Sequence, residues 1–243
     1  MAENRAIIKS FKILEVVANH PDGVTLSEIV KETKLPKSTV FDILEALYNL
    51  DAIYFKDRYR KSYVIGSRLF AVGQAYTKNS NLIQNASDLI EMHSEKYSTN
   101  CEVYKRVGKK VVCVSSISPK SSRLASSAVG AMDNVTNCPV GLVFLAYLPK
   151  DEVESIMELV PALKKPAILA QIAKVAAQGF VLDSGIKDNC VYTYAVPIFN
   201  FENKIVGVVS ASKIRNNSEG IGDEISLLIE IGKQISKRQG YRK

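Results

Sequence analysis

Lys37, Ser38 and Thr39 are three consecutive hydrogen-bonding residues that directly follow Pro36. Proline suits the first turn of a helix, and apolar residues then recur at helical spacing from position 40 to position 50. A helix with one buried face and a polar, basic tip can place that tip in the major groove of DNA. A lysine there contacts phosphates or guanine, and hydroxyls contact phosphates or base edges. The sequence therefore predicts a DNA-recognition helix that begins at this tip.

The preceding residues predict two more helices. An amphipathic helix is expected over residues 4–19, with Phe11 among its apolar positions. Thr25 and Glu28 then form the capping-box pattern of a short helix that reaches about residue 33. A brief turn separates this helix from the recognition helix, as in a helix-turn-helix motif.

A basic hairpin is expected after the third helix, because strand-like runs at 53–55 and 63–65 flank a polar loop. Three helices followed by a two-stranded ribbon form a winged helix-turn-helix. Cations of the wing provide affinity and salt dependence rather than sequence choice. A solvated surface or a protein-docking winged helix has similar features, but the combination favours DNA binding. The candidate DNA-contacting residues are Thr25, Ser27, Pro36, Lys37, Ser38, Thr39, Phe41, Asp42, Lys56, Arg58, Arg60 and Lys61.

The rest of the chain alternates between helical and strand-like patterns, which predicts an α+β fold with a mostly antiparallel sheet. Helices are expected at 67–77, from about 82, and at 138–148, 150–159, 166–177 and 220–238. Strands are expected at 101–107, 111–117, 180–184, 191–199 and 204–212, with a serine-rich loop over 118–136. We expect a DNA-binding domain at 1–66, a linker helix at 67–79 and a second domain at 80–243.

Composition bounds the remaining possibilities for this chain of 243 residues. The net charge is +7, but residues 1–80 carry 12 Lys/Arg against 9 Asp/Glu, so total charge is weak evidence for a polyanionic partner. The isolated His20 and His93 and the absence of a CxxC pair argue against a zinc site, and we expect no cofactor. Apolar runs are too short for a bilayer and no signal-peptide core is evident, so we expect no membrane partner and a cytoplasmic location.

Catalysis finds little support in the sequence. Neither histidine forms a Ser/His/Asp pattern, and the chain has no Walker loop and no GxGxxG motif. We therefore expect a protein that is not an enzyme, with a small-molecule enzyme carrying an accessory winged domain as a distant alternative.

Three N-terminal segments, residues 25–29, 35–40 and 59–66, resemble the DNA-binding domain of IclR-type bacterial transcriptional regulators. Segments 179–183, 195–199 and 205–212 are similar, in order and spacing, to the effector domain of that family. The resemblance covers nearly the whole chain. It implies a winged helix-turn-helix, a linker helix and a GAF-like effector-binding domain. It also implies dimers or tetramers on a palindromic DNA operator, and a small organic-acid effector, which is a carboxylate.

The resemblance also places an effector pocket. Asp183 stands at the family's pocket-facing aspartate, and Thr193 stands where a cysteine is usual. Ser210 and Ser212 are two apart on an expected strand, so both face the same side. The helix start near residue 138 would offer free amides to a carboxylate. The candidate effector-binding residues are Ala125, Asn137, Cys138, Pro139, Val140, Asp183, Val191, Thr193, Ser210 and Ser212.

Departures from the family pattern affect both sites. Phe41 and Asp42 replace the family's usual His-Arg, so the operator need not match the usual one. Pro139 removes an amide donor from the helix start, and Leu142 replaces a usual lysine. The ligand can therefore differ, or ligand control can be lost. We expect a transcriptional regulator, a repressor rather than an activator, with a second domain used only for oligomerisation as the alternative.

Overall fold

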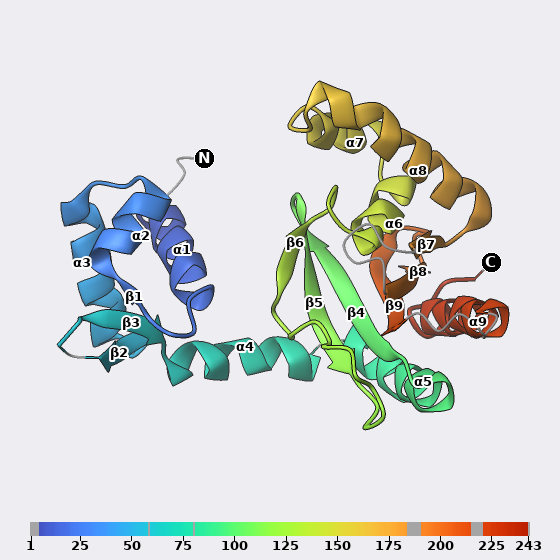
Figure 1. The fold of residues 1–243 in the computed structure, drawn as a ribbon, viewed down its shortest axis with the longest axis horizontal. Coiled ribbons are helices and arrows are strands. Elements are labelled where there is room, and N and C mark those ends of the chain that lie inside the picture. Colours follow the sequence, from blue (N-terminus) through green and yellow to red (C-terminus); the bar gives the residue numbers. More distant parts are fainter. Residues whose placement is uncertain (1–4, 58, 80, 184–190, 215–220, 243) are drawn as a thin grey trace. The chain divides into compact units, whose positions relative to one another are not determined.

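The computed structural model describes residues 5–57, 59–79, 81–183, 191–214 and 221–242. Arg58, one of the expected wing cations, lies outside these described residues. The chain forms two compact units, residues 1–79 and residues 80–243, shown as ribbons in Figure 1. Each unit has its own hydrophobic core.

The N-terminal unit is the expected winged helix-turn-helix. Its three strands form an antiparallel sheet in the order β1-β3-β2, and α1, α2 and α3 pack around a core that includes Ile13, Ile29 and Leu44. Its elements are α1 (Arg5–Ala18), β1 (Val24–Thr25), α2 (Leu26–Thr33), α3 (Lys37–Asn49), β2 (Ile53–Asp57), β3 (Ser62–Ile65) and α4 (Ser67–Asn79).

The expected capping box at the start of α2 is confirmed. The Glu28 amide donates to Thr25 Oγ1 at 3.4 Å, and the Thr25 amide donates to Glu28 Oε2 at 2.8 Å. These bonds to Thr25 lower the pKa of Glu28. The helix ends at Lys34, whose backbone is left-handed with φ 57°, and this sharp turn leads into α3.

Two details of the N-terminal unit differ from the sequence-based expectation. Strand β1 was not expected, because two residues carry no periodic signal; it exists through the pairing of Val24 with Tyr63. In α1 the core-facing residues are Ile13 and Val17, whereas Phe11 is 64% exposed. Apolar residues lie on two sides of α1, so periodicity alone does not identify the buried side.

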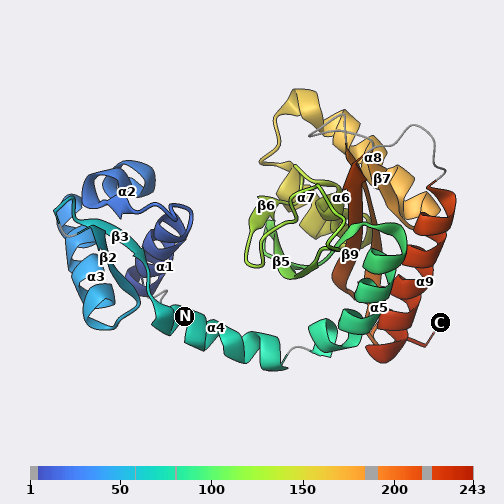
Figure 2. The ribbon, with the colours of Figure 1, turned by 60° about the horizontal axis from the view of Figure 1, so that its bottom comes forward.

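The C-terminal unit is an α+β domain around a six-stranded antiparallel sheet with the order β6-β5-β4-β9-β8-β7. Figures 1 and 2 show α5 and α9 on one face of this sheet and α6 with α8 on the other. Its elements are α5 (Asn81–Tyr97), β4 (Asn100–Val107), β5 (Lys110–Ile117), β6 (Met132–Asn134), α6 (Pro139–Tyr147), α7 (Lys150–Met157), η1 (Ala162–Lys164), α8 (Lys165–Gln178), β7 (Val181–Asp183), β8 (Val191–Phe199), β9 (Ile205–Ile214) and α9 (Gly222–Arg238).

Strand β6 corrects the expectation of a continuous loop over residues 118–136. Met132 pairs with Val112 of β5, and Asn134 pairs with Lys110. The strand is three residues long, lies at the edge of the sheet and has no buried residue. Nothing in its sequence alternates, so only the pairing with β5 identifies it as a strand.

The start of α6 is held very close to the chain that precedes it. A Cβ atom at Gly141 would lie 2.0 Å from the carbonyl oxygen of Val135. This is a steric clash, so only glycine, which has no Cβ, fits at this position. Residues 140–145 of α6 are all buried, so the helix cannot move away from this contact without opening the core.

Gly141→Ala is therefore expected to destabilise the C-terminal unit by about 1–3 kcal/mol through overpacking. Gly222→Ala is the matched control, because a Cβ atom at Gly222 meets no atom within 4 Å. The control is expected to stay within about 0.5 kcal/mol of the parent protein. Urea unfolding followed by circular dichroism measures both effects, and equal unfolding midpoints for the two variants would contradict the prediction.

Candidate DNA interface and effector pocket

The tip of α3 is a polar, solvent-exposed surface. Lys37 and Ser38 are exposed and Thr39 is half-buried, while Val40 begins the buried side of the helix. Pro36 occupies the N-cap position, one residue before the first helical turn, and makes no side-chain cap. The first amide groups of a helix have no intrahelical partner and point out of its N-terminal end, which suits contact with phosphate.

Phe41 and Asp42 lie one turn further along α3, and both are exposed. Phe41 has 51% of its surface accessible, so its ring is available to a partner. A thymine methyl group is one apolar feature that a major-groove helix contacts, and a carboxylate accepts from cytosine N4. These two side chains therefore extend the candidate base-reading surface of the tip.

The candidate residues of α2 are differently placed. The Thr25 hydroxyl donates to Glu28 Oε2 at 2.7 Å and serves the capping box. Ser27 is exposed beside it in the first turn of the helix. The Ser27 hydroxyl is thus available to a phosphate, whereas the Thr25 hydroxyl is already hydrogen-bonded within the capping box.

The wing is ordered by a single carboxylate. Asp57 Oδ1 accepts from the amides of Tyr59 and Arg60 at 2.8 and 3.1 Å, and these bonds lower the pKa of Asp57. Arg60 and Lys61 are exposed at the tip that this carboxylate holds.

Lys56 differs from the other wing cations because its ammonium group is already engaged. Lys56 Nζ lies 3.1 Å from Asp22 Oδ1 and 3.1 Å from the carbonyl oxygen of Pro21. An exposed ion pair of this kind is weak, so a phosphate can compete for the lysine. Arg60 and Lys61 remain the better candidates for backbone contacts.

In the C-terminal unit, a cavity of about 230 Å³ lies between the sheet and the start of α6. Six of the ten candidate effector-binding residues line it: Cys138, Pro139, Val140, Thr193, Ser210 and Ser212. The remaining lining residues are Tyr104, Val111, Ser127, Ala131, Met132 and Asp133. Hydroxyl groups from β4, β8, β9 and the loop before β6 thus converge on one small space.

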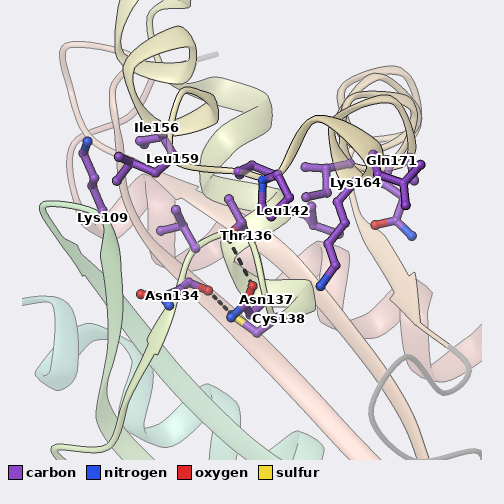
Figure 3. Close-up of a pocket in the computed structure, with 16 residues that line it drawn as sticks. Lys109, Asn134, Thr136, Asn137, Cys138, Leu142, Ile156, Leu159, Lys164 and Gln171 are labelled. Carbon is purple, nitrogen blue, oxygen red and sulfur yellow. Dashed lines mark hydrogen bonds between the residues drawn. The ribbon is translucent and has the colours of Figure 1, made fainter.

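Four candidate residues do not line this cavity. Asp183 pairs with Thr193 at the edge of the sheet, but its side chain lies outside the cavity wall, as do Ala125 and Val191. Asn137 lies in a neighbouring groove of about 770 Å³, shown in Figure 3. There its Oδ1 accepts from the Thr136 hydroxyl at 3.2 Å.

The larger groove is a weaker candidate than the small cavity. It runs between the start of α6 and the helices α7 and α8, and two of its lining residues, Leu159 and Leu163, are 71% and 94% exposed. Ligand sites bring a few polar groups together within an apolar wall. That convergence occurs in the smaller cavity, although Cys138 lines both spaces.

Three residues of the small cavity region were missed by the sequence analysis. Tyr104 donates its hydroxyl proton to Ser127 Oγ at 2.8 Å. Behind them Glu102 is only 3% exposed; its Oε2 accepts from Ser210 Oγ at 3.0 Å, and its Oε1 lies 3.5 Å from the Ser127 amide. Alternation along residues 101–107 places Glu102 and Tyr104 on one side of a strand, but their partners follow only from strand pairing.

Glu102 is a buried acid without an ionic partner in the described part of the chain. Burial raises its pKa, and the hydrogen bonds from Ser210 and Ser127 offset part of that effect. The neighbouring Tyr104 and Cys113 thiol also have raised pKa values, mainly through burial, and that of Cys113 reaches about 12.

The start of α6 offers few free amides to an anion. Pro139 has no N–H, and the amides of Gly141 and Leu142 donate to the Cys138 carbonyl at 3.1 and 3.3 Å. Of the first four positions, Val140 alone keeps an N–H for which the described residues provide no partner. The amide cradle implied by the family resemblance is therefore reduced here.

The described residues contain no group of three or more His, Cys, Asp or Glu side chains that could hold a metal ion. His93 is instead packed in the core, with Nδ1 3.1 Å from Thr99 Oγ1 and Nε2 3.0 Å from the Glu224 carbonyl. No described helix combines the length and apolar character needed to cross a bilayer.

Comparison with known proteins identifies the class to which this fold and surface belong. The IclR helix-turn-helix domain matches residues 6–56, and the C-terminal domain of bacterial IclR transcriptional regulators matches residues 74–237. The chain therefore belongs to the IclR family and is a DNA-binding transcriptional regulator.

Individual relatives match this chain over nearly their whole lengths. The chain is 22% identical to the Escherichia coli regulator XynR, covering 98% of both chains, and 22% identical to the E. coli regulator KdgR, covering 97% of this chain and 93% of KdgR. An IclR regulator from Alicyclobacillus acidocaldarius has the same fold, with a TM-score of 0.82, 18% identity and coverage of 98% and 100%. An IclR homologue from Microbacterium hydrocarbonoxydans, complexed with 4-hydroxybenzoate, gives a TM-score of 0.77, 17% identity and coverage of 97% and 99%.

Glu102 makes stability depend on pH in a defined direction. A carboxyl whose folded-state pKa is raised contributes stability that is complete below its unfolded pKa and is lost as pH rises through the folded pKa. Glu102→Gln keeps the uncharged form at every pH. We expect its free energy of unfolding to rise relative to the parent protein as pH increases above the ordinary glutamate pKa of about 4.3, by up to about 1.4 kcal/mol per pH unit, until the raised folded-state pKa is passed.

Urea unfolding at several pH values measures this difference. Glu91→Gln is the control, because it makes the same chemical change on an exposed position of α5. The control curve is expected to run parallel to that of the parent protein. A difference between Glu102→Gln and the parent that does not change with pH would show that burial leaves the carboxyl unaffected.

Proposed function

We propose that this regulator is a repressor that binds a palindromic operator as a dimer or tetramer in the cytoplasm. The single observation that carries the DNA-binding assignment is the exposed tip of α3 beside an ordered, basic wing. Residues 1–66 form the DNA-binding domain, residues 67–79 the linker helix, and residues 80–243 the domain for effector binding and oligomerisation.

The DNA contacts divide into two kinds. The side chains at the start of α3, Lys37 and Ser38 first, read base edges and the adjoining phosphates. Arg60 and Lys61 at the wing bind the sugar-phosphate backbone and give affinity that falls with salt. Asp42 makes the recognition surface less cationic. This favours discrimination between DNA sequences by hydrogen bonds to bases over attraction by charge alone.

The effector proposal is supported by the small cavity and its converging hydroxyl groups. At about 230 Å³ it lies below the roughly 300–1,000 Å³ of pockets for drug-sized ligands, so the effector is a compact molecule. The Microbacterium homologue, with its bound 4-hydroxybenzoate, provides a precedent for a small ligand on this fold. A C-terminal unit used only for oligomerisation has no need of such a cavity.

Control of DNA binding requires a difference in affinity. The effector shifts the DNA-bound population only if it binds one conformation of the protein more tightly than the other, and DNA changes effector affinity by the same factor. A compound that binds both conformations equally would stabilise the protein and leave repression unchanged.

The DNA proposal is tested with Lys37→Ala and Arg60→Ala, using Lys174→Ala on the exposed side of α8 as the control. Lys37→Ala is expected to reduce discrimination between the operator and random DNA by about 1–3 kcal/mol. Arg60→Ala is expected to weaken all DNA equally and to reduce the salt slope by about 0.9.

Fluorescence anisotropy with the operator selected from genomic fragments, at several salt concentrations, measures both quantities. Lys174→Ala should bind like the parent protein. If Lys37→Ala and Arg60→Ala both bound DNA like the parent protein, the assignment of these two residues as DNA contacts would be wrong.

The effector proposal predicts saturable stabilisation by a small molecule. A ligand present at about 100 times its Kd adds about 2.7 kcal/mol to the unfolding free energy. Thermal-shift screening of sugars, sugar acids and aromatic acids, followed by titration, measures this gain. If no compound gave saturable stabilisation or altered operator binding, the oligomerisation-only alternative would stand.

A further inference from the structure

Strand pairing places a set of polar residues at and behind the wall of the small cavity, where Thr193, Ser210 and Ser212 line it. In one row across the sheet, Thr193 pairs with Ser212, which pairs with Asn100. In the next row, Ser210 of β9 pairs with Glu102 of β4. Ser210 and Glu102 are 1% and 3% exposed and are joined by a hydrogen bond of 3.0 Å. The sheet therefore brings a buried acid to the back of a hydroxyl-lined space.

The directions of the hydrogen bonds determine what this wall offers to a ligand. Ser210 donates its only proton to Glu102, so the Ser210 oxygen presents lone pairs to the cavity that it lines. Asn100 donates through Nδ2 to the Leu124 carbonyl at 2.8 Å, while its buried Oδ1 has no hydrogen-bond partner among the described residues. The wall thus presents an acceptor oxygen at Ser210, and the sheet next to it holds a second acceptor, Asn100 Oδ1, that lacks a donor among the described residues.

An anionic ligand finds little to stabilise it in this cavity. Among the described residues, the lining includes Asp133 and contains no lysine or arginine. The helix start that would offer amides has lost one donor at Pro139, and two others are bonded to Cys138, which leaves the single Val140 amide. A ligand carboxylate has no proton to give to Ser210 and would lie close to a second carboxyl, that of Glu102.

A purely structural role does not account for Glu102. Burying an acid without a cation costs stability, and an apolar residue of similar size would avoid that cost. A buried acid beside a cavity is more typical of a functional site. The hydrogen bond from Ser210, which lines the cavity, to Glu102 gives this acid a role in ligand recognition.

We propose that the effector is a compact, uncharged polyhydroxyl compound, a sugar or polyol, whose O–H groups donate to the acceptor oxygens of this wall. Glu102 is the specificity-determining residue, because it holds the Ser210 hydroxyl as an acceptor. This inference rests on the proposed effector role of the cavity, and it replaces the carboxylate effector expected from the family resemblance.

The test uses matched six-carbon ligands on the full-length protein: glucitol, gluconate and glucamine, together with the four- and five-carbon members of each series. Isothermal titration calorimetry gives the Kd, and thermal shift with operator binding gives the response. We expect saturable binding of at least one polyol, at least tenfold tighter than the matched acid and the matched amine. Nonspecific stabilisation by polyols does not saturate and affects all variants alike.

Three variants locate the selectivity. In Glu102→Gln the side-chain amide can donate to Ser210, which releases the serine proton toward the cavity, so the preference for polyol over acid is expected to fall at least tenfold. Ser210→Ala retains Glu102 and is expected to weaken polyol binding at least tenfold. If Glu102→Gln does not fold, this variant alone tests whether the Ser210 oxygen accepts from the polyol. Glu91→Gln on the exposed side of α5 is expected to retain the preference.

The outcomes separate the two proposals. Tighter binding of an acid or an amine than of its matched polyol overturns this inference and leaves the effector role intact. Polyol selectivity that survives both Glu102→Gln and Ser210→Ala also overturns it. If no compound of any class binds while operator binding is normal, the effector role itself fails.

Discussion

The antiparallel pairing of β4 with β9 is the constraint on which both the core and the cavity of the C-terminal unit depend. It brings Glu102 and Ser210 together although they are 108 residues apart in the sequence. Between these polar positions, Cys101, Val209 and Ala211 face the opposite side and pack against α5 and α9. A slip of one residue would turn the polar set toward that core and the apolar set toward the α6 side, so the hydrophobic alternation fixes the register. The cavity is therefore positioned by residues that do not touch it.

The same pairing sets a balance between stability and recognition. Polar groups on the α6 side of the sheet interrupt an otherwise apolar interface, where each has to find a partner or cost stability. Tyr104 donates to Ser127 and Ser210 donates to Glu102, whereas Asn100 Oδ1 has no partner in the part of the chain that the structure describes. A ligand that completes this network gains more than the same ligand on an exposed surface, because water no longer competes for the buried groups.

Local chemistry made most of the fold predictable from the sequence. The capping box at Thr25, the periodic helices and the parity of Ser210 and Ser212 all follow from residues close together in the chain. What failed depends on distant contacts. Phe11 lies on one of two apolar sides of α1, and only tertiary packing selects the other side. Lys56 meets Asp22 across 34 residues, and Glu102 meets Ser210 across the sheet. Periodicity assigns a residue to a face but does not say which residue it meets there.

Strand β9 also connects the cavity to the beginning of the C-terminal unit. Ser210 lines the cavity, and three residues earlier a Cβ atom at Gly207 would lie 2.8 Å from Cδ2 of Leu82, on the first turn of α5. Leu82 is buried in the core, and the chain passes into the N-terminal unit only a few residues before it. Because close-packed interiors transmit small displacements, a shift of β9 on ligand binding would displace the first turn of α5. Within one chain, the path from Ser210 in the cavity wall therefore runs along β9 to the packing contact between Gly207 and Leu82, and from there along the chain toward the N-terminal unit.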